Sequence, residues 1–193
     1  MQQARRPLLT ESIRLHGGQD RLRQLTLYVS QECAAAARFG LVKLNKTLWR
    51  ADFVSYACRR VPVTGRPYQR LDQGPAPKEM PHILNDLLRD EMIRFDITDF
   101  GDGIRERKPV PLGKPNMTYF TDDDVRFVDK AIRHYWDLTG QESSDDSHGV
   151  AWQSRENGTP MFYELAYLSD RALGPRQTQR ALARAAEAGW SSR

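Results

Sequence analysis

The chain has little of the chemistry that marks a metal site, a nucleotide site or a membrane span. It has two cysteines and four histidines in 193 residues, and no cysteine–histidine spacing resembles a zinc site. It contains no phosphate-binding loop, no GxGxxG and no GxSxG. No apolar run approaches the roughly 20 residues of a transmembrane helix. We therefore expect no metal, no cofactor and no membrane contact.

What is present describes a globular protein with a modest positive charge. Hydrophobic residues make up 39% and charged residues 28%, as in folded domains. The N-terminal residues lack the long apolar stretch of a secretory signal, so we expect a cytoplasmic protein with Cys33 and Cys58 as buried, reduced thiols. The net charge of +4 permits contact with nucleic acid without requiring it. We do not expect a nucleic-acid partner.

The spacing of apolar residues predicts mostly helices. Helical patterns cover residues 20–38, 41–60, 82–94 and a segment that begins at Thr121. Thr121 and Asp124 have the spacing of a capping box. Weak alternation around Gly101 predicts a β-hairpin within residues 95–119. The expected fold is mainly α with a small inserted β element (α+β), built as a compact single-domain helical bundle.

The two ends of the chain differ in composition from its middle. Residues 1–19 are polar, so we expect a flexible N-terminal arm with room for a short helix over Glu11–Leu15. Residues 174–193 follow a Gly-Pro break and are alanine-rich and basic, which favours an appended helical tail. The domain itself is then expected over residues 20–173.

The most informative residue is an acid within a helix. Stepping about 100° per residue from Leu41 to Cys58 places Asp52 in the middle of the apolar arc, with Asn45 beside it. A carboxylate there must be neutralised or must find donors, because an unpaired buried charge is very costly. We interpret Asp52 as a structural fastener. The alternative is a recognition or catalytic acid in a pocket.

Candidate donors to this acid come from two later segments. Tyr68 lies in a stretch rich in glycine and proline, and Ser147 and His148 lie in the turn-rich sequence SDDSHG. Asp52 with Ser147 and His148 would also suit a hydrolase, but no strained nucleophile turn or oxyanion donor can be recognised. We expect no enzyme and no catalytic residue. The predicted structural polar cluster consists of Asn45, Asp52, Tyr68, Ser147 and His148.

Candidate contacts with a partner fall on the same helix and on one loop. Lys43 and Arg50 belong to a basic helix face, which is usually just solvated. Trp49 is an aromatic residue that could serve as a binding hot spot, although such residues are more often core. The segment at residues 74–77 reads GPAP, and a loop stiffened by proline is expected to be exposed. The candidate partner-binding residues are therefore Gly74, Pro75, Pro77, Lys43, Arg50 and Trp49.

Four segments in order resemble a known family. They are LVKLNKTLWRADF, VTGRPYQRLDQGPAP, the Thr121 helix and SDDSHGVAW. The matching features are Lys43-Leu44-Asn45-Lys46, Ala51-Asp52, Gly65 with Tyr68, Gly74-Pro75, and Ser144 with Ser147-His148 before Trp152. Together they resemble the Panacea domain, or SocA-like family, known from bacterial toxin–antitoxin pairs and phage-associated genes. The resemblance spans roughly residues 20–168, and Thr47 and Trp49 depart from the family pattern.

The resemblance implies an antitoxin that binds a protein toxin from the same operon and keeps it inactive. The SocA-like branch resembles a proteolytic adaptor, so the first alternative is delivery of a toxin or client to a cytoplasmic protease. A third possibility is a hydrolase that uses Asp52 and His148. A fourth is a nucleic-acid-binding module, for which the positive net charge is the only support. Self-association of the chain into a homo-oligomer is a further possibility that the sequence leaves open.

Overall fold

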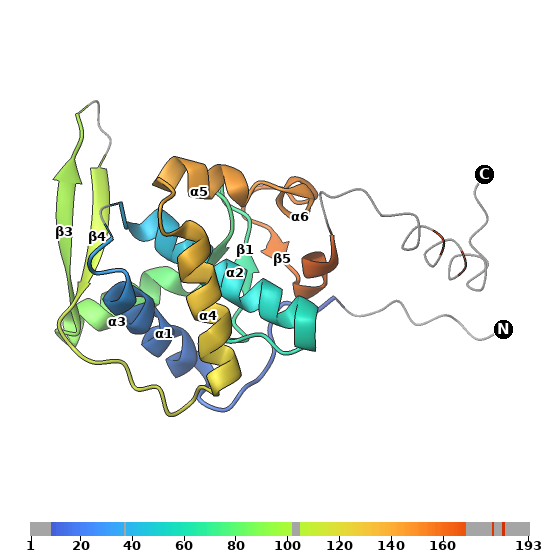
Figure 1. The fold of residues 1–193 in the computed structure, drawn as a ribbon, viewed down its shortest axis with the longest axis horizontal. Helices are drawn as coiled ribbons and strands as arrows, with labels where there is room; N and C mark the ends of the chain where they lie inside the picture. The colour runs from blue at the N-terminus through green and yellow to red at the C-terminus, as the bar shows by residue number, and fades with distance from the viewer. Residues whose placement is uncertain (1–8, 37, 102–104, 169–178, 180–182, 184–193) are drawn as a thin grey trace.

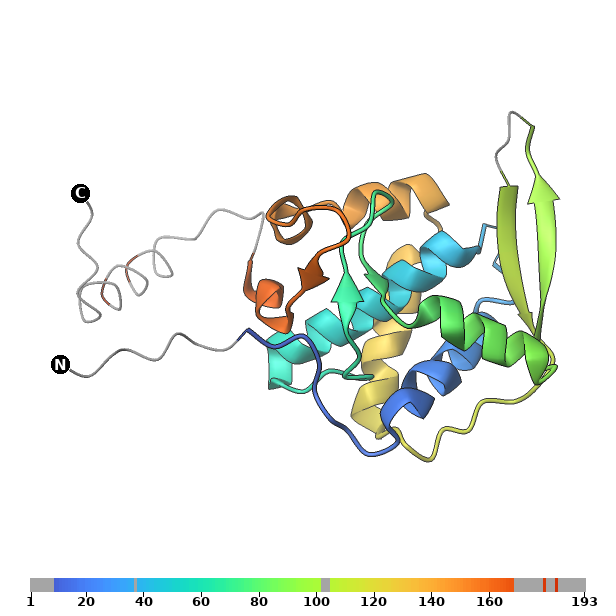
Figure 2. The same ribbon diagram turned by 180° about the vertical axis from the view of Figure 1, so that it is seen from behind.

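The computed structural model describes residues 9–36, 38–101, 105–168, 179 and 183. It is mainly helical with two small antiparallel sheets (Figures 1 and 2). The predicted fold class, mainly α with a small β element, is confirmed. Within the described ranges, no helix combines the length and the apolar character needed to cross a bilayer.

Helices come first in the chain, and pairs of strands stand between later helices. The helices are α1 (Gly18–Glu32), α2 (Leu41–Arg59), α3 (Met80–Arg89), α4 (Asp122–Tyr135), α5 (Gly140–Asp146), α6 (Val150–Gln153) and the 3₁₀ helix η1 (Tyr163–Tyr167). The strands are β1 (Tyr68–Gln69), β2 (Ala76–Pro77), β3 (Ile93–Asp99), β4 (Arg105–Pro111) and β5 (Pro160–Met161). One sheet has the order β2-β1-β5, and β3 and β4 form the other.

Helix α2 is the central element. It contacts α1, α4, α5, η1 and the short strand β2. The main core lies between these helices, where Leu25 of α1, Leu44 and Leu48 of α2 and Val128 of α4 are all fully buried. Because neighbours surround α2, its polar side chains are enclosed as well as its apolar ones. The expectation of a solvated basic face on this helix is therefore wrong for Lys43, which is 2% exposed.

One carboxylate joins three helices at the start of α4. Thr121 and Asp124 form the predicted capping box, which is confirmed. Asp124 is buried and accepts hydrogen bonds from Arg21 of α1, at 2.9 Å, and from Arg59 of α2. Burial acts to raise the pKa of Asp124, but the bonds from Arg59, Thr121 and Arg21 outweigh it and lower that pKa. This ionic contact holds α1, α2 and α4 together.

The predicted β-hairpin is confirmed. Strands β3 and β4 pair in register from Ile93 opposite Pro111 to Asp99 opposite Arg105, and residues 102–104 of the turn lie outside the described residues. The hairpin stands at one side of the molecule, and β4 lies between β3 and the helices (Figure 1). The helix predicted over residues 82–94 ends earlier, at Arg89, because the chain enters β3 at residue 93.

The described part of the N-terminal segment is bound to the domain. The Ile13 N–H donates to Gly65 O and the Tyr163 N–H donates to Thr10 O, both at 2.9 Å. The short helix expected over Glu11–Leu15 is not formed. Residues 1–8 and nearly all of the tail at 174–193 lie outside the described residues, so the domain boundaries stay predictions.

The two thiols differ in exposure. Cys33 of α1's C-cap is buried, as expected, whereas Cys58 near the end of α2 is exposed. The prediction of two buried thiols is therefore wrong for Cys58. The helix pattern placed this residue at the end of α2, where the neighbouring elements no longer cover it.

Candidate functional site

Both carboxylate oxygens of Asp52 accept hydrogen bonds from neighbouring residues. Asp52 is 0% exposed. The Thr64 N–H donates to Oδ1 at 2.6 Å, and the hydroxyls of Thr64 and Tyr68 donate to Oδ2, the latter at 2.9 Å. The Tyr163 hydroxyl lies 3.5 Å from Oδ2 and donates to Arg66 O at 2.8 Å. These contacts connect α2 to the loop before β1, to β1 and to η1.

The surroundings of Asp52 disfavour its charged form. Burial raises the pKa of this carboxyl, while the hydrogen bonds from Thr64 and Tyr68 act in the opposite direction. The rings of Tyr68 and Tyr163 flank Phe53 at centroid distances of 5.5 and 5.2 Å. Asp52 therefore sits in a closed aromatic cluster that offers no room for a substrate. Its geometry is that of the predicted fastener.

Sequence reasoning identified Tyr68 as a donor but missed Thr64 and Tyr163. Thr64 lies in the same Gly- and Pro-rich stretch as Tyr68, twelve residues after Asp52, so it could have been proposed. Tyr163 is 111 residues from Asp52, and no local pattern connects them. Only the packing of η1 against α2 brings its hydroxyl to this site.

Ser147 and His148 lie in a second polar cluster, away from Asp52. A Cβ added to Gly74 would lie 2.2 Å from Ser147 Oγ and 2.7 Å from Lys46 Nζ, so these groups converge on that glycine. Ser147 Oγ donates to Ser144 O at 2.7 Å, and His148 Nε2 lies 3.3 Å from Ser144 Oγ. The cluster is formed by α2, the loop before β2 and the end of α5.

The single polar cluster predicted from the sequence is therefore wrong, and the structure divides it in two. Asp52 and Tyr68 are together, but Ser147 and His148 belong to the second cluster. Asn45 and Asp52 are seven residues apart on α2, which corresponds to about 10 Å along the helix axis. Asn45 Oδ1 is buried and has no hydrogen-bond partner within the described residues.

The second cluster contains a buried ammonium group. Lys46 is 2% exposed, and its Nζ donates to Pro75 O at 3.0 Å. No carboxylate of the described residues lies within ion-pair distance of it. Burial lowers the pKa of Lys46 to about 7. Burial, followed by the charge of Lys46, also lowers the pKa of His148.

The GPAP segment closes over this lysine. Residues 74–77 are all buried, with Ala76 and Pro77 forming β2 beside β1. The expectation of an exposed loop is therefore wrong for Gly74, Pro75 and Pro77. Glycine suits position 74 because a Cβ there would meet the side chains of Ser147 and Lys46, and not because the segment faces solvent.

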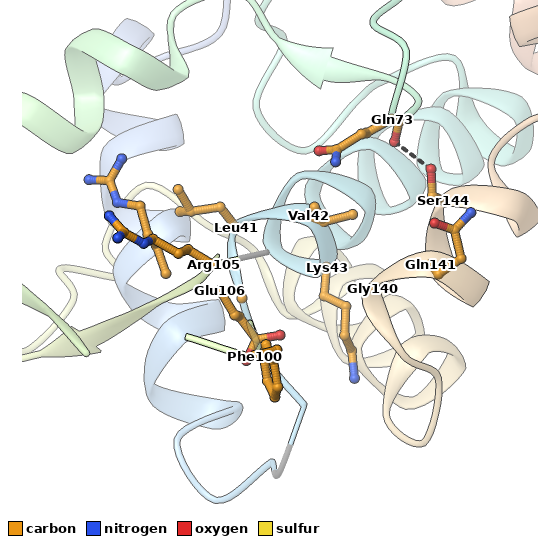
Figure 3. A pocket seen from close by; sticks show the side chains of 12 residues that line it. Leu41, Val42, Lys43, Gln73, Phe100, Arg105, Glu106, Gly140, Gln141 and Ser144 are labelled. Carbon is orange, nitrogen blue, oxygen red and sulfur yellow. Dashed lines mark hydrogen bonds between the residues drawn. The ribbon is translucent and has the colours of Figure 1, made fainter. Parts of the chain in front are cut away.

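Lys43 borders a surface pocket but does not present a free charge there. Its Nζ donates to Trp136 O at 3.0 Å and its side chain is buried. The pocket has a volume of about 510 Å³ and lies between the start of α2, α5 and the hairpin. Figure 3 shows Lys43 directed away from Gln73, whose carbonyl accepts a hydrogen bond from Ser144 Oγ. The predicted role of Lys43 as an exposed contact is wrong.

Trp49 and Arg50 line a second groove, of about 460 Å³, between α2, α6 and η1. Arg50 lies 3.9 Å from Asp146, and Trp49 packs against Phe53 at 5.6 Å between centroids. The Trp49 Nε1 is buried without a hydrogen-bond partner among the described residues. Val54, which is 38% exposed, also lines the groove. The groove brings together Trp49 and Arg50, and tryptophan and arginine are enriched in binding hot spots.

The arrangement expected for a hydrolase is not formed in the described part of the chain. Asp52 and His148 belong to different clusters, and Asp52 is enclosed by hydroxyl and amide donors. Among the same residues, no group of three His, Cys, Asp or Glu side chains is placed to hold a metal ion.

The sequence from residue 44 to 153 matches the model of the antitoxin SocA-like, Panacea domain family. This is 110 of the 193 residues, and the chain belongs to that family. The resemblance based on the four sequence segments is thus confirmed. Neither the curated proteins nor the solved structures contain a match to this chain. Apart from Tyr163, the residues of both polar clusters lie within the matched range, as does most of the groove lining.

Proposed function

We propose that this chain is an antitoxin that neutralises a co-expressed protein toxin by binding it directly. Membership of the antitoxin SocA-like, Panacea domain family carries the proposal. Its mechanism is steric: a preformed surface covers the active region of the toxin or holds it in an inactive form. The role of Asp52 as an internal fastener supports this, because its oxygens are committed to Thr64 and Tyr68.

We assign the toxin contact to the groove that contains Trp49 and Arg50. Trp and Arg side chains contribute most to binding when a partner excludes water from them. The Arg50 guanidinium lies 3.9 Å from Asp146 and 6.0 Å from the Tyr135 ring centroid, so both contacts are long and it remains able to pair with a carboxylate of the toxin. Lys43 and the GPAP segment are buried, so the groove is the remaining place where the predicted contact residues reach the surface.

The test is co-expression with the gene next to this one in the same operon. The neighbour should arrest growth alone, and this chain should restore growth and co-purify with its product. Val54→Arg places a charge in the groove and should abolish both effects. Leu88→Arg is the matched control, because Leu88 is equally exposed, at 37%, but lies on α3 outside the groove. A neighbour that is harmless alone would contradict the proposal.

The same experiment separates direct neutralisation from the adaptor alternative. If the toxin accumulates in a stable complex with this chain, neutralisation is by binding. If the toxin disappears when the chain is present and returns when cytoplasmic proteases are removed, the chain acts as a proteolytic adaptor. In both cases Val54→Arg should weaken binding of the toxin to the groove, whereas Leu88→Arg should not.

A further inference from the structure

The hairpin has a defined alternation of inward and outward backbone groups. The Leu112 N–H donates to Met92 O at 2.8 Å, next to the first strand pair, Ile93 with Pro111. In an antiparallel pair, bonded and non-bonded residue pairs alternate. The even-numbered residues are therefore bonded across the hairpin, and the odd-numbered residues direct their N–H and C=O groups outward. The prolines fit this alternation, because they stand at odd positions of β4.

The two edges of the hairpin are not equivalent. The outer edge of β4 lacks N–H groups at Pro109 and Pro111, and this strand packs against α1 and α2. The outer edge of β3 contains no proline and lies on the far side from the helices (Figures 1 and 2). Within the described residues, the outward backbone groups of Phe95 and Ile97 have no hydrogen-bond partner. One edge is thus blocked and the other is open to a further strand.

We propose that the β3 edge pairs with β3 of a second copy of this chain, antiparallel and about a two-fold axis. In the pairing with Phe95 opposite Phe95 of the second copy, Arg94 lies opposite Asp96 of the second copy, and the symmetry repeats this contact. Both side chains are about half exposed, at 55% and 50%, and share one face of the strand. Opposite charges on facing strands stabilise a sheet. The edge is therefore complementary to itself.

Other two-fold registers are less favourable. A register centred on Asp96 places two carboxylates directly opposite one another. A register centred on Ile97 places Phe95 opposite Asp99 and leaves Arg94 without an acid. Charge complementarity between Arg94 and Asp96 thus selects the Phe95 register, independently of the proposed toxin contact.

Sedimentation velocity of the full chain over a range of concentrations tests this inference. The interface is small, so the dimer should be weak and depend on concentration. Arg94→Asp and Asp96→Arg each place like charges opposite one another twice and should weaken dimerisation about tenfold or more. An equimolar mixture of the two variants should form a heterodimer, because each then supplies the charge that the other lacks. Arg126→Asp on α4 is the charge control and should dimerise as the wild type does.

Two results would overturn the inference. A wild-type chain that stays monomeric into the millimolar range has no such edge contact. A dimer that neither single variant weakens uses another surface. Arg94 and Asp96 also pair with each other within one copy. Thermal melting of each variant is therefore the control that distinguishes a weakened dimer from a weakened fold.

Discussion

Replacing Lys46 by methionine should stabilise the protein, although it removes a hydrogen bond. The lysine keeps an ammonium group in a site that is 2% exposed, with Pro75 O as its acceptor. Each pH unit between the unfolded and folded pKa values corresponds to about 1.4 kcal/mol. A fall from 10.5 to about 7 therefore costs the folded state about 5 kcal/mol at low pH. Methionine has a similar length and no charge. After about 1–3 kcal/mol is deducted for the unpaired carbonyl, a net gain of about 2 kcal/mol or more is expected.

The pH dependence gives a second measurement of the same effect. The folded chain releases the Lys46 proton near pH 7 and the unfolded chain releases it near pH 10.5. Between these values the unfolded state binds more protons, so the free energy of unfolding should rise with pH across that window. The destabilisation is complete below pH 7 and absent above pH 10.5. Lys46→Met should remove this rise.

Urea denaturation of wild type and variant between pH 6 and about pH 10 measures both quantities. Lys114→Met provides the control, because Lys114 is exposed and its replacement should leave stability and its pH dependence unchanged. The reasoning is refuted if Lys46→Met is less stable than wild type at neutral pH and retains the wild-type rise with pH. That result would mean that the ammonium group has a stabilising partner in the folded state.

Two further pairs of replacements test the polar clusters. Asp52→Ala should lower the free energy of unfolding by about 3–5 kcal/mol, because it leaves buried donors without an acceptor, whereas Asp52→Asn retains one acceptor and should lose about half as much in the same urea titration. Gly74→Ala should destabilise the protein by more than Gly158→Ala in thermal melts. Both glycines have positive φ angles, of 95° and 77°, but only at Gly74 would a Cβ meet other atoms within 4 Å.

The outcomes that contradict these two expectations are distinct. An Asp52→Ala protein that melts like wild type but loses the proposed toxin neutralisation would make the acid a recognition group. Equal losses for Gly74→Ala and Gly158→Ala would show that the left-handed backbone accounts for the whole effect. The proximity of Gly74 to Lys46 and Ser147 would then contribute nothing to the loss of stability in Gly74→Ala.

Local features of the fold were predictable because nearby residues determine them. Thr121 and Asp124 form their capping box within one turn, and the alternation in residues 95–119 produces a hairpin whose strands are close in sequence. The boundary of α3 was less predictable. Apolar spacing continues to Arg94, but the chain leaves the helix at Asp90 and turns at Glu91, which has a φ angle of 53°.

The candidate site was predictable only where one helix and its next loop determine it. The apolar arc around Asp52 and the position of Tyr68 were sufficient to identify a buried acid with a donor. The pattern failed for Lys43, because a helical wheel assumes one buried side and α2 has neighbours on several. It also failed for Tyr163, since its contact depends on the final position of a distant segment.

The distance in sequence between Asp52 and Tyr163 has a consequence for synthesis. At roughly 5–20 residues per second, a ribosome adds Tyr163 about 6–22 seconds after Asp52. During that interval the nascent chain contains Asp52 but not yet Tyr163, so the contact between them cannot form. The Tyr163 N–H also donates to Thr10 O, so this contact of the N-terminal segment forms only after the late segment has been added. A chain still being translated therefore has the Asp52 helix before it has the contact that joins this helix to η1.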